Sequence, residues 1–101
     1  MGETLLEVSF TGAVVEWRGP APFHFIAVPE ECVLPIRVAA REASYGWGVV
    51  PVTAEIGGIS FATSLFPRDG GYLLPLKNTV RRATGLTVGS RAEVLMRVAR
   101  R

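Results

Sequence analysis

Two turn signals in the middle of the chain constrain its fold more than any other feature of the sequence. Gly57-Gly58 separates two segments in which apolar and polar residues alternate, WGVVPVTAEI and ISFATSLF. A glycine pair in this position is typical of a two-residue β-hairpin, because such turns need positive φ angles. Asp69-Gly70-Gly71 is a second turn signal, and the short apolar segment YLLP follows it. The middle of the chain is therefore predicted to form antiparallel strands.

Alternation of apolar and polar residues also marks the first strand, but it changes partway along. Segment 4–17, TLLEVSFTGAVVEW, alternates up to Phe10, and the apolar positions then shift by one residue to Val15 and Trp17. A shift of this kind around a glycine predicts a β-bulge near Gly12. Val15 and Trp17 are then expected to continue the core-facing side, with Trp17 packing in the core or at its rim.

Two more strands are predicted from the same signal. Segment 23–29, FHFIAVP, is apolar on both faces, which indicates a strand buried on both sides. Segment 91–99, RAEVLMRVA, alternates strictly and is predicted to be the last strand.

Two helices are expected between the strands. Segment 29–44 begins with a proline and two glutamates, which favour a helix start, but Pro35 is expected to limit it to one or two short turns. A second helix is predicted from Pro75 to Thr84, ended by Gly85 in the left-handed conformation. The predicted fold class is therefore mainly β: a small single-domain β-barrel with one or two short helices.

Length and composition narrow the class of protein. The chain has 101 residues, which fits one domain over 1–101, and its 49% hydrophobic content is typical of a globular protein. No apolar run reaches the roughly 18 residues that a membrane span needs, and no secretory signal is recognised at the start. Cys32 is the single cysteine, so an internal disulfide is excluded and a cytoplasmic location is the expectation.

The search for catalytic chemistry assigns no catalytic residue. One histidine and one cysteine cannot form a zinc set, and the glycines match neither a dinucleotide motif nor a phosphate loop, so no metal or cofactor is predicted. Cys32 is interpreted as a packing thiol, and His24 as a structural histidine without an identified partner. An enzyme of unknown reaction stays as an alternative to a non-catalytic protein.

Positive charge is concentrated in the last third of the chain. Residues 1–67 carry 3 cations and 7 acids (3 − 7 = −4), whereas residues 68–101 carry 8 cations and 2 acids (8 − 2 = +6). Lys77 and Arg81 are four residues apart in the predicted second helix and Arg82 follows them. Like charges at this spacing repel one another, and a bound anion or an acidic neighbour would relieve the repulsion.

The basic helix is therefore the candidate site for an anionic ligand. Lys77, Arg81 and Arg68 are predicted to hold the anionic group, with Tyr72 and Trp47 at the rim. The expected partner is an anionic small molecule or a protein. Nucleic-acid binding by the same face is the weaker alternative, because the net charge of the chain is only +2. A homodimer is a further alternative.

The chain resembles, over essentially its whole length and most strongly in segment 46–90, a bacterial family known as domain of unknown function 1905. The similarity is carried by GWG with the following VPV, by the IGG hairpin, and by TSLFP, GGYLLPLK, VRRA and Gly89. The resemblance implies a small barrel of the double-split type and no established activity. It also indicates two departures from the family pattern, since Arg68 and Ser90 stand where an acidic residue is common. DNA-binding dimers of the AbrB type share a related barrel, which is an analogy of fold alone.

Overall fold

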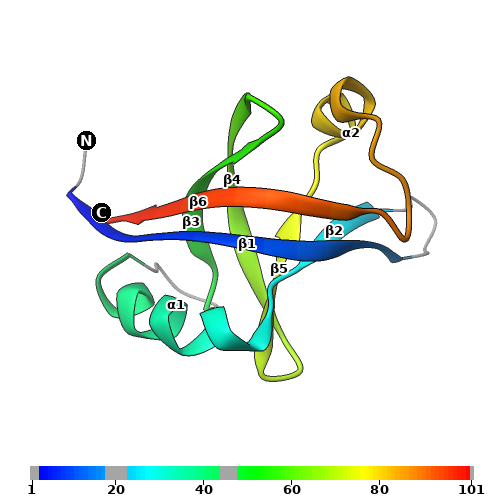
Figure 1. Ribbon diagram of the computed structural model, residues 1–101. Coiled ribbons are helices and arrows are strands. Elements are labelled where there is room, and N and C mark those ends of the chain that lie inside the picture. The colour runs from blue at the N-terminus through cyan, green and yellow to red at the C-terminus, as the bar shows by residue number, and fades with distance from the viewer. Residues whose placement is uncertain (1–2, 18–22, 44–47, 101) are drawn as a thin grey trace.

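The computed structural model describes residues 3–17, 23–43 and 48–100, which form a β-barrel with two helices (Figure 1). The strands are β1 (Thr4–Trp17), β2 (Phe23–Ala27), β3 (Val50–Ile56), β4 (Ile59–Arg68), β5 (Gly71–Pro75) and β6 (Arg91–Ala99), and the helices are α1 (Glu30–Ala43) and α2 (Asn78–Thr84). The strands close in the order β1-β2-β5-β4-β3-β6, and every neighbouring pair is antiparallel. The predicted mainly β barrel is confirmed.

Tight turns join the middle strands, as the glycine pairs predict. Gly57 and Gly58 have φ angles of 57° and 80° between β3 and β4, and Ile56 pairs with Ile59. The turn between β4 and β5 is formed by Asp69 and Gly70, with φ angles of 50° and 78°. Positive φ at both central residues gives the turn a twist that matches the flanking strands.

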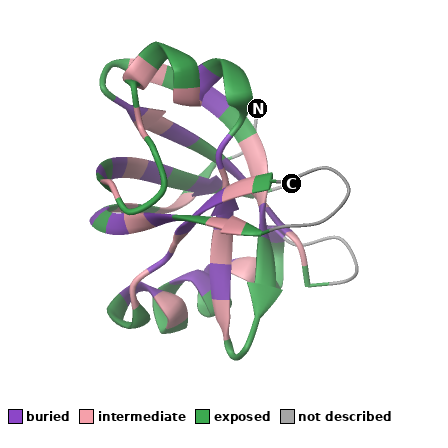
Figure 2. Ribbon diagram, turned by 90° about the vertical axis from the view of Figure 1, so that its right-hand side faces the viewer, coloured by how far each residue is buried: buried purple, intermediate pink, exposed green. Residues whose placement is uncertain are grey.

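The core of the molecule is the inside of the barrel. Buried and exposed residues alternate along the strands, as the banded ribbons of Figure 2 show. Among the side chains with no exposed surface are Ile26, Leu65, Leu74, Met96 and Val98, which come from β2, β4, β5 and β6. The period-2 pattern of the strands therefore places one apolar side of the sheet in the core.

Helix α1 is longer and more regular than the sequence predicts. It runs unbroken through Pro35, whereas one or two short turns were expected. Its buried residues lie on one stripe and pack with the barrel core: Cys32, Ile36, Ala39 and Ala43. Pro35 is exposed at the edge of this stripe, and burial of the stripe stabilises the helix although proline donates no backbone hydrogen bond.

Helix α2 begins later than predicted. Pro75 is still in β5, where it pairs with Phe25, and the helix starts at Asn78. Gly85 ends it with a φ of 74°, and its N–H donates to the carbonyl of Arg81 at 2.9 Å, as a glycine C-cap requires. Val80 is the residue of α2 that is buried.

Strand β1 has no bulge at Gly12. Its register with β6 is continuous over the pairs from Leu6 to Ala13, and the irregularity lies between Thr4 and Leu6. A Cβ on Gly12 would lie 2.4 Å from the carbonyl oxygen of Ala27 at the end of β2. The glycine is therefore required by the close approach of β2, at the point where β1 passes from pairing with β6 to pairing with β2.

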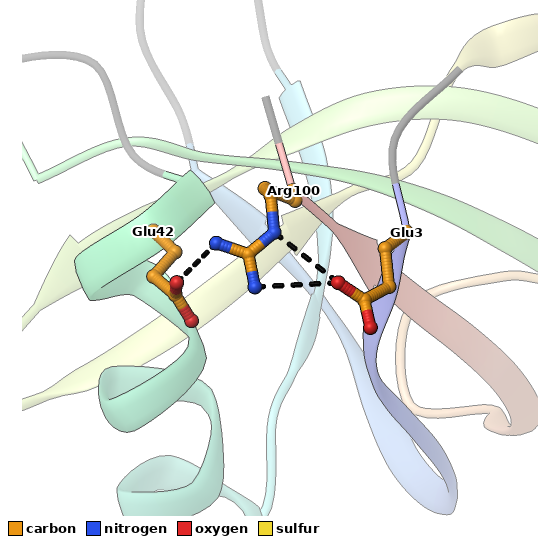
Figure 3. Close-up of polar contacts among 3 residues, drawn as sticks. All are labelled: Glu3, Glu42 and Arg100. Carbon is orange, nitrogen blue, oxygen red and sulfur yellow. Dashed lines mark hydrogen bonds and ion pairs between the residues drawn. The ribbon is translucent and has the colours of Figure 1, made fainter.

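The first and last strands are joined to α1 by one arginine. The guanidinium of Arg100 lies between Glu3, which precedes β1, and Glu42 of α1 (Figure 3). Its Nε atom is 3.3 Å from the carboxylate of Glu3, and its backbone N–H donates to the carbonyl of Glu3 at 2.7 Å. The hydrogen bond to Glu42, followed by the contact with Glu3, raises the pKa of Arg100.

Candidate functional site

The outer surface of β2 and its neighbours carries aromatic side chains. The register pairs Trp17 with Phe23 and Val15 with Phe25, which puts these side chains on the same face of the sheet. Val14 and Ile26 point into the barrel, with exposures of 1% and 0%, so the alternate positions point outward. Val15 and Trp17 therefore do not continue the core-facing side as predicted, and Phe23 is exposed rather than buried.

Three aromatic rings on this face meet at steep angles. Phe25 is 7% exposed, and its centroid lies 6.4 Å from that of Trp17 and 6.4 Å from that of Phe66. The ring planes are inclined by 47° to Trp17 and by 80° to Phe66. Phe25 thus lies at the base of the cluster, and the rings of Trp17 and Phe66 beside it are exposed. We call these three residues the aromatic corner.

Arg68 covers part of the aromatic corner. Its guanidinium carbon lies 4.2 Å from the centroid of the Trp17 ring, which is the geometry of a cation–π contact. Its Nε is 3.6 Å from the carboxylate of Asp69, a residue held in the left-handed region at φ 50° and almost fully exposed. The β4–β5 turn therefore presents a cation and a carboxylate beside the rings.

A groove of about 610 Å³ runs along this face. The side chains of the aromatic corner, the turn and the neighbouring strands line it: Val15, Glu16, Trp17, Phe25, Ala27, Val28, Arg68, Asp69, Gly71, Tyr72 and Leu73. The structure thus brings together Arg68 and Tyr72, two residues of the site predicted from the sequence. Tyr72 is only 8% exposed and belongs to the wall of the groove more than to its rim.

Lys77 and Arg81 lie elsewhere on the barrel. They belong to the region of α2, which Figure 1 shows at the opposite end of β5 from the β4–β5 turn. The predicted site is therefore divided between the groove and the helix, and the structure does not place its residues in one cluster. Trp47, the remaining predicted rim residue, lies outside the described residues.

The cations of α2 lack the ion pairs that three arginines elsewhere in the described chain form. Arg97 and Arg100 form ion pairs with glutamates, and Arg68 with Asp69. Within residues 3–17, 23–43 and 48–100, no carboxylate lies in ion-pair distance of Lys77, Arg81 or Arg82. The Nε atom of Arg81 is also buried without a hydrogen-bond acceptor among these residues.

The two residues considered for catalysis have structural surroundings. Cys32 is 8% exposed in the α1 stripe, and burial together with the nearby charge of Glu31 raises the pKa of its thiol. His24 is mostly buried, and its Nε2 atom is 3.5 Å from the carboxylate of Glu16 on the neighbouring strand. The described part of the chain contains no group of His, Cys, Asp and Glu residues that could hold a metal ion. It also contains no helix that is long and apolar enough to cross a membrane.

Comparison with protein families finds one family model that spans both regions. The model of DUF1905, a domain of unknown function, matches residues 10–96, which include the groove, the aromatic corner and α2. The chain belongs to the DUF1905 family. Comparison with curated proteins finds no match. The activity of this DUF1905 domain therefore has to be inferred from its own side chains.

The aromatic corner is the part of the DUF1905 domain that sequence reasoning missed. Its signal is present, because segment 23–29 is apolar on both faces and the apolar positions shift after Gly12. The first feature was interpreted as burial on both sides, and the second as a β-bulge. In the structure they indicate instead that the outer face of the sheet becomes apolar over β2 and the end of β1.

Proposed function

We propose that this DUF1905 domain is a non-catalytic binding module and that α2 binds an anionic group of a small molecule or of a protein partner. The observation that carries the proposal is the lack of a carboxylate partner for Lys77 and Arg81 among the described residues. Lys77 is the N-cap of α2 and Arg81 lies within the helix, and cations without internal partners that are this close in the chain create a local positive potential, which attracts anions.

The buried Nε atom of Arg81, a half-buried residue, supports this assignment. A buried donor without an acceptor costs about 1–3 kcal/mol, more when it is charged, and a ligand oxygen would remove that cost. Arginine also matches phosphate and carboxylate oxygens in a two-pronged geometry. The backbone N–H of Arg81 donates to the carbonyl of Lys77 at 2.9 Å, so the two residues are one turn apart and can contact the same group.

We restrict the anion site to Lys77 and Arg81. Arg68 was predicted to contribute to it, but its guanidinium has Asp69 and the ring of Trp17 as neighbours, next to a different part of the barrel. Arg82 is exposed on α2 and stays available to a larger anion.

A thermal-shift screen with phosphorylated and carboxylated metabolites tests the proposal. A ligand at 100 times its Kd stabilises the folded protein by about 2.7 kcal/mol, which raises the Tm visibly in a domain of this size. The shift should disappear in the double variant Lys77→Ala/Arg81→Ala. The matched control is Arg41→Gln/Arg97→Gln, which removes the same charge away from α2 and should keep the shift.

Salt distinguishes the outcomes of the screen. A shift that persists at physiological salt and requires Lys77 and Arg81 supports a ligand site. A shift shared by all polyanions, including short nucleic acids, and lost steeply with salt would replace the proposal with nucleic-acid binding. A Tm shift that persists in the double variant would show that the ligand binds at a site other than α2.

A further inference from the structure

The groove beside the aromatic corner shares no residue with the anion site on α2. Among its described lining residues, the carboxylate of Asp69 lies beside the guanidinium of Arg68, whereas the carboxylate of Glu16 is 3.5 Å from Nε2 of His24. Asp69 extends into solvent with a side-chain exposure of 91%, and Arg68 at 47% is its ion-pair partner. Because Arg68 already contacts Asp69 and the ring of Trp17, the described lining residues offer no unpaired cation to an anion in this groove.

The shape of the aromatic corner suits an organic cation. The face of an aromatic ring carries negative potential, and tryptophan attracts cations most strongly. Trp17 and Phe66 rise as inclined walls on either side of Phe25, so a compact cation between them would contact more than one ring. The position of Arg68 shows that this space accepts a planar cation, since its guanidinium carbon is 4.2 Å from the Trp17 centroid.

We propose that the aromatic corner is a binding site for an organic cation, a guanidinium or a methylated ammonium group. Arg68 is the chain's own occupant of the site, and the ligand cation replaces it over Trp17. Asp69 then pairs with the ligand cation, while the guanidinium of Arg68 turns to solvent.

Arg68 is placed so that it can leave without disturbing the fold. It is the last residue of β4, directly before the turn formed by Asp69 and Gly70, and it is exposed. Its exchange requires rotation of the side chain alone, because the backbone pair between Arg68 and Gly71 is part of the sheet. Arg68 therefore competes with the ligand and weakens its binding.

The test is an NMR titration with tetramethylammonium chloride, with ionic strength held constant by sodium chloride. The indole N–H signal of Trp17 reports binding, and the variant Trp17→Phe identifies it against the signal of Trp47. Tert-butanol, a neutral molecule of similar shape, is the control probe. We expect tetramethylammonium to shift the Trp17 signal and tert-butanol to leave it nearly unchanged.

Variants of the turn decide the role of Arg68. Removal of a cation–π competitor at an exposed site should tighten tetramethylammonium binding by about twofold to fivefold in Arg68→Ala. Arg68→Met keeps the apolar part of the side chain and should also tighten tetramethylammonium binding. It therefore provides the same test if the alanine variant folds poorly. Asp69→Asn should weaken binding, and Arg41→Ala on α1 should bind as the wild type does.

Two results would overturn the proposal. Equal binding of tert-butanol would reduce the site to an apolar groove, and weaker or absent binding in both Arg68 variants would show that Arg68 does not occupy a cation site. If the proposal holds, choline and a trimethyllysine peptide separate the sources of the cation. A preference for choline indicates a small molecule, and a preference for the peptide indicates a protein partner. None of these results depends on α2, so the anion proposal stands or fails separately.

Discussion

The outer surface of the barrel has two faces with different chemistry, although strand β1 contributes to both. Along its first part β1 presents Glu7, Ser9 and Thr11 outward, beside Glu93 and Arg97 of β6. Along its last part it presents Val15 and Trp17, beside the aromatic side chains of β2. The inward side chains of both parts are apolar and pack in one core.

This difference shows which side chains are fixed by barrel formation and which are not. Closure of the barrel demands an apolar inner side everywhere, but it sets no requirement on the outer side. On the polar face, Arg97 and Glu7 pair with each other at 2.7 Å. The aromatic face exposes Trp17, Phe23 and Phe66 by 47–61%, and clustered exposure of this kind marks interaction sites.

The largest expected effect comes from the residue where β1 passes between the two faces. Gly12→Val should lower the free energy of unfolding by about 3 kcal/mol or more, because the new side chain meets backbone of β2 that cannot move aside. Gly71→Ala is the matched control, since its Cβ would have ordinary contacts at 3.7 Å or more. Urea unfolding of both variants measures the difference. Equal stability of the two would contradict the close approach of β1 and β2.

A second pair of variants sharpens the comparison within the aromatic face. Phe25→Ala should lower the free energy of unfolding by about 2–3 kcal/mol, because Phe25 is 7% exposed and covered by its neighbours. This is somewhat less than the loss expected when a fully buried phenylalanine is replaced by alanine. Phe23→Ala should change stability by less than about 0.5 kcal/mol, because Phe23 is 61% exposed. Thermal unfolding measures both. A large loss in Phe23→Ala would show that the aromatic face is part of the core.

The smallest effect is expected on the polar face. Arg97→Ala removes an exposed ion pair with Glu7, which is worth about 0.2–1 kcal/mol, and the loss should shrink at high salt. Arg41→Ala, whose side chain forms no ion pair with a described residue, serves as control. Tm values at two salt concentrations give the comparison. A loss in Arg97→Ala that is independent of salt would assign the effect to packing of the arginine stem.

Local signals in the sequence predicted the hairpins and the last strand. The turn at Gly57-Gly58 and the strict alternation of 91–99 depend on neighbouring residues alone, and the structure confirms both. The continuous course of α1 through Pro35 was not predictable in this way, because the barrel against which α1 packs is assembled from distant segments. The proximity of Gly12 to Ala27 has the same origin.

The candidate site was predicted less well than the fold. A strand with apolar residues on both faces does not reveal which face is inside, so the exposure of Phe23 and Trp17 was missed. Residues 68–81 are close in sequence, and this suggested one site for Arg68, Tyr72, Lys77 and Arg81. Strand β5 runs between them and carries α2 away from the β4–β5 turn.

The pairing of β1 with β6 has a consequence for how the chain reaches its fold. The pairs Thr4–Ala99 and Ala13–Arg91 join residues 95 and 78 positions apart (99 − 4 and 91 − 13). Contacts of such separation form slowly, since a long loop must close before they contribute any stability. The hairpins of β3, β4 and β5 can form early, but on the ribosome the barrel stays open until β6 has emerged. During that interval the unpaired edges of β1 and β3 are the surfaces most prone to misassembly.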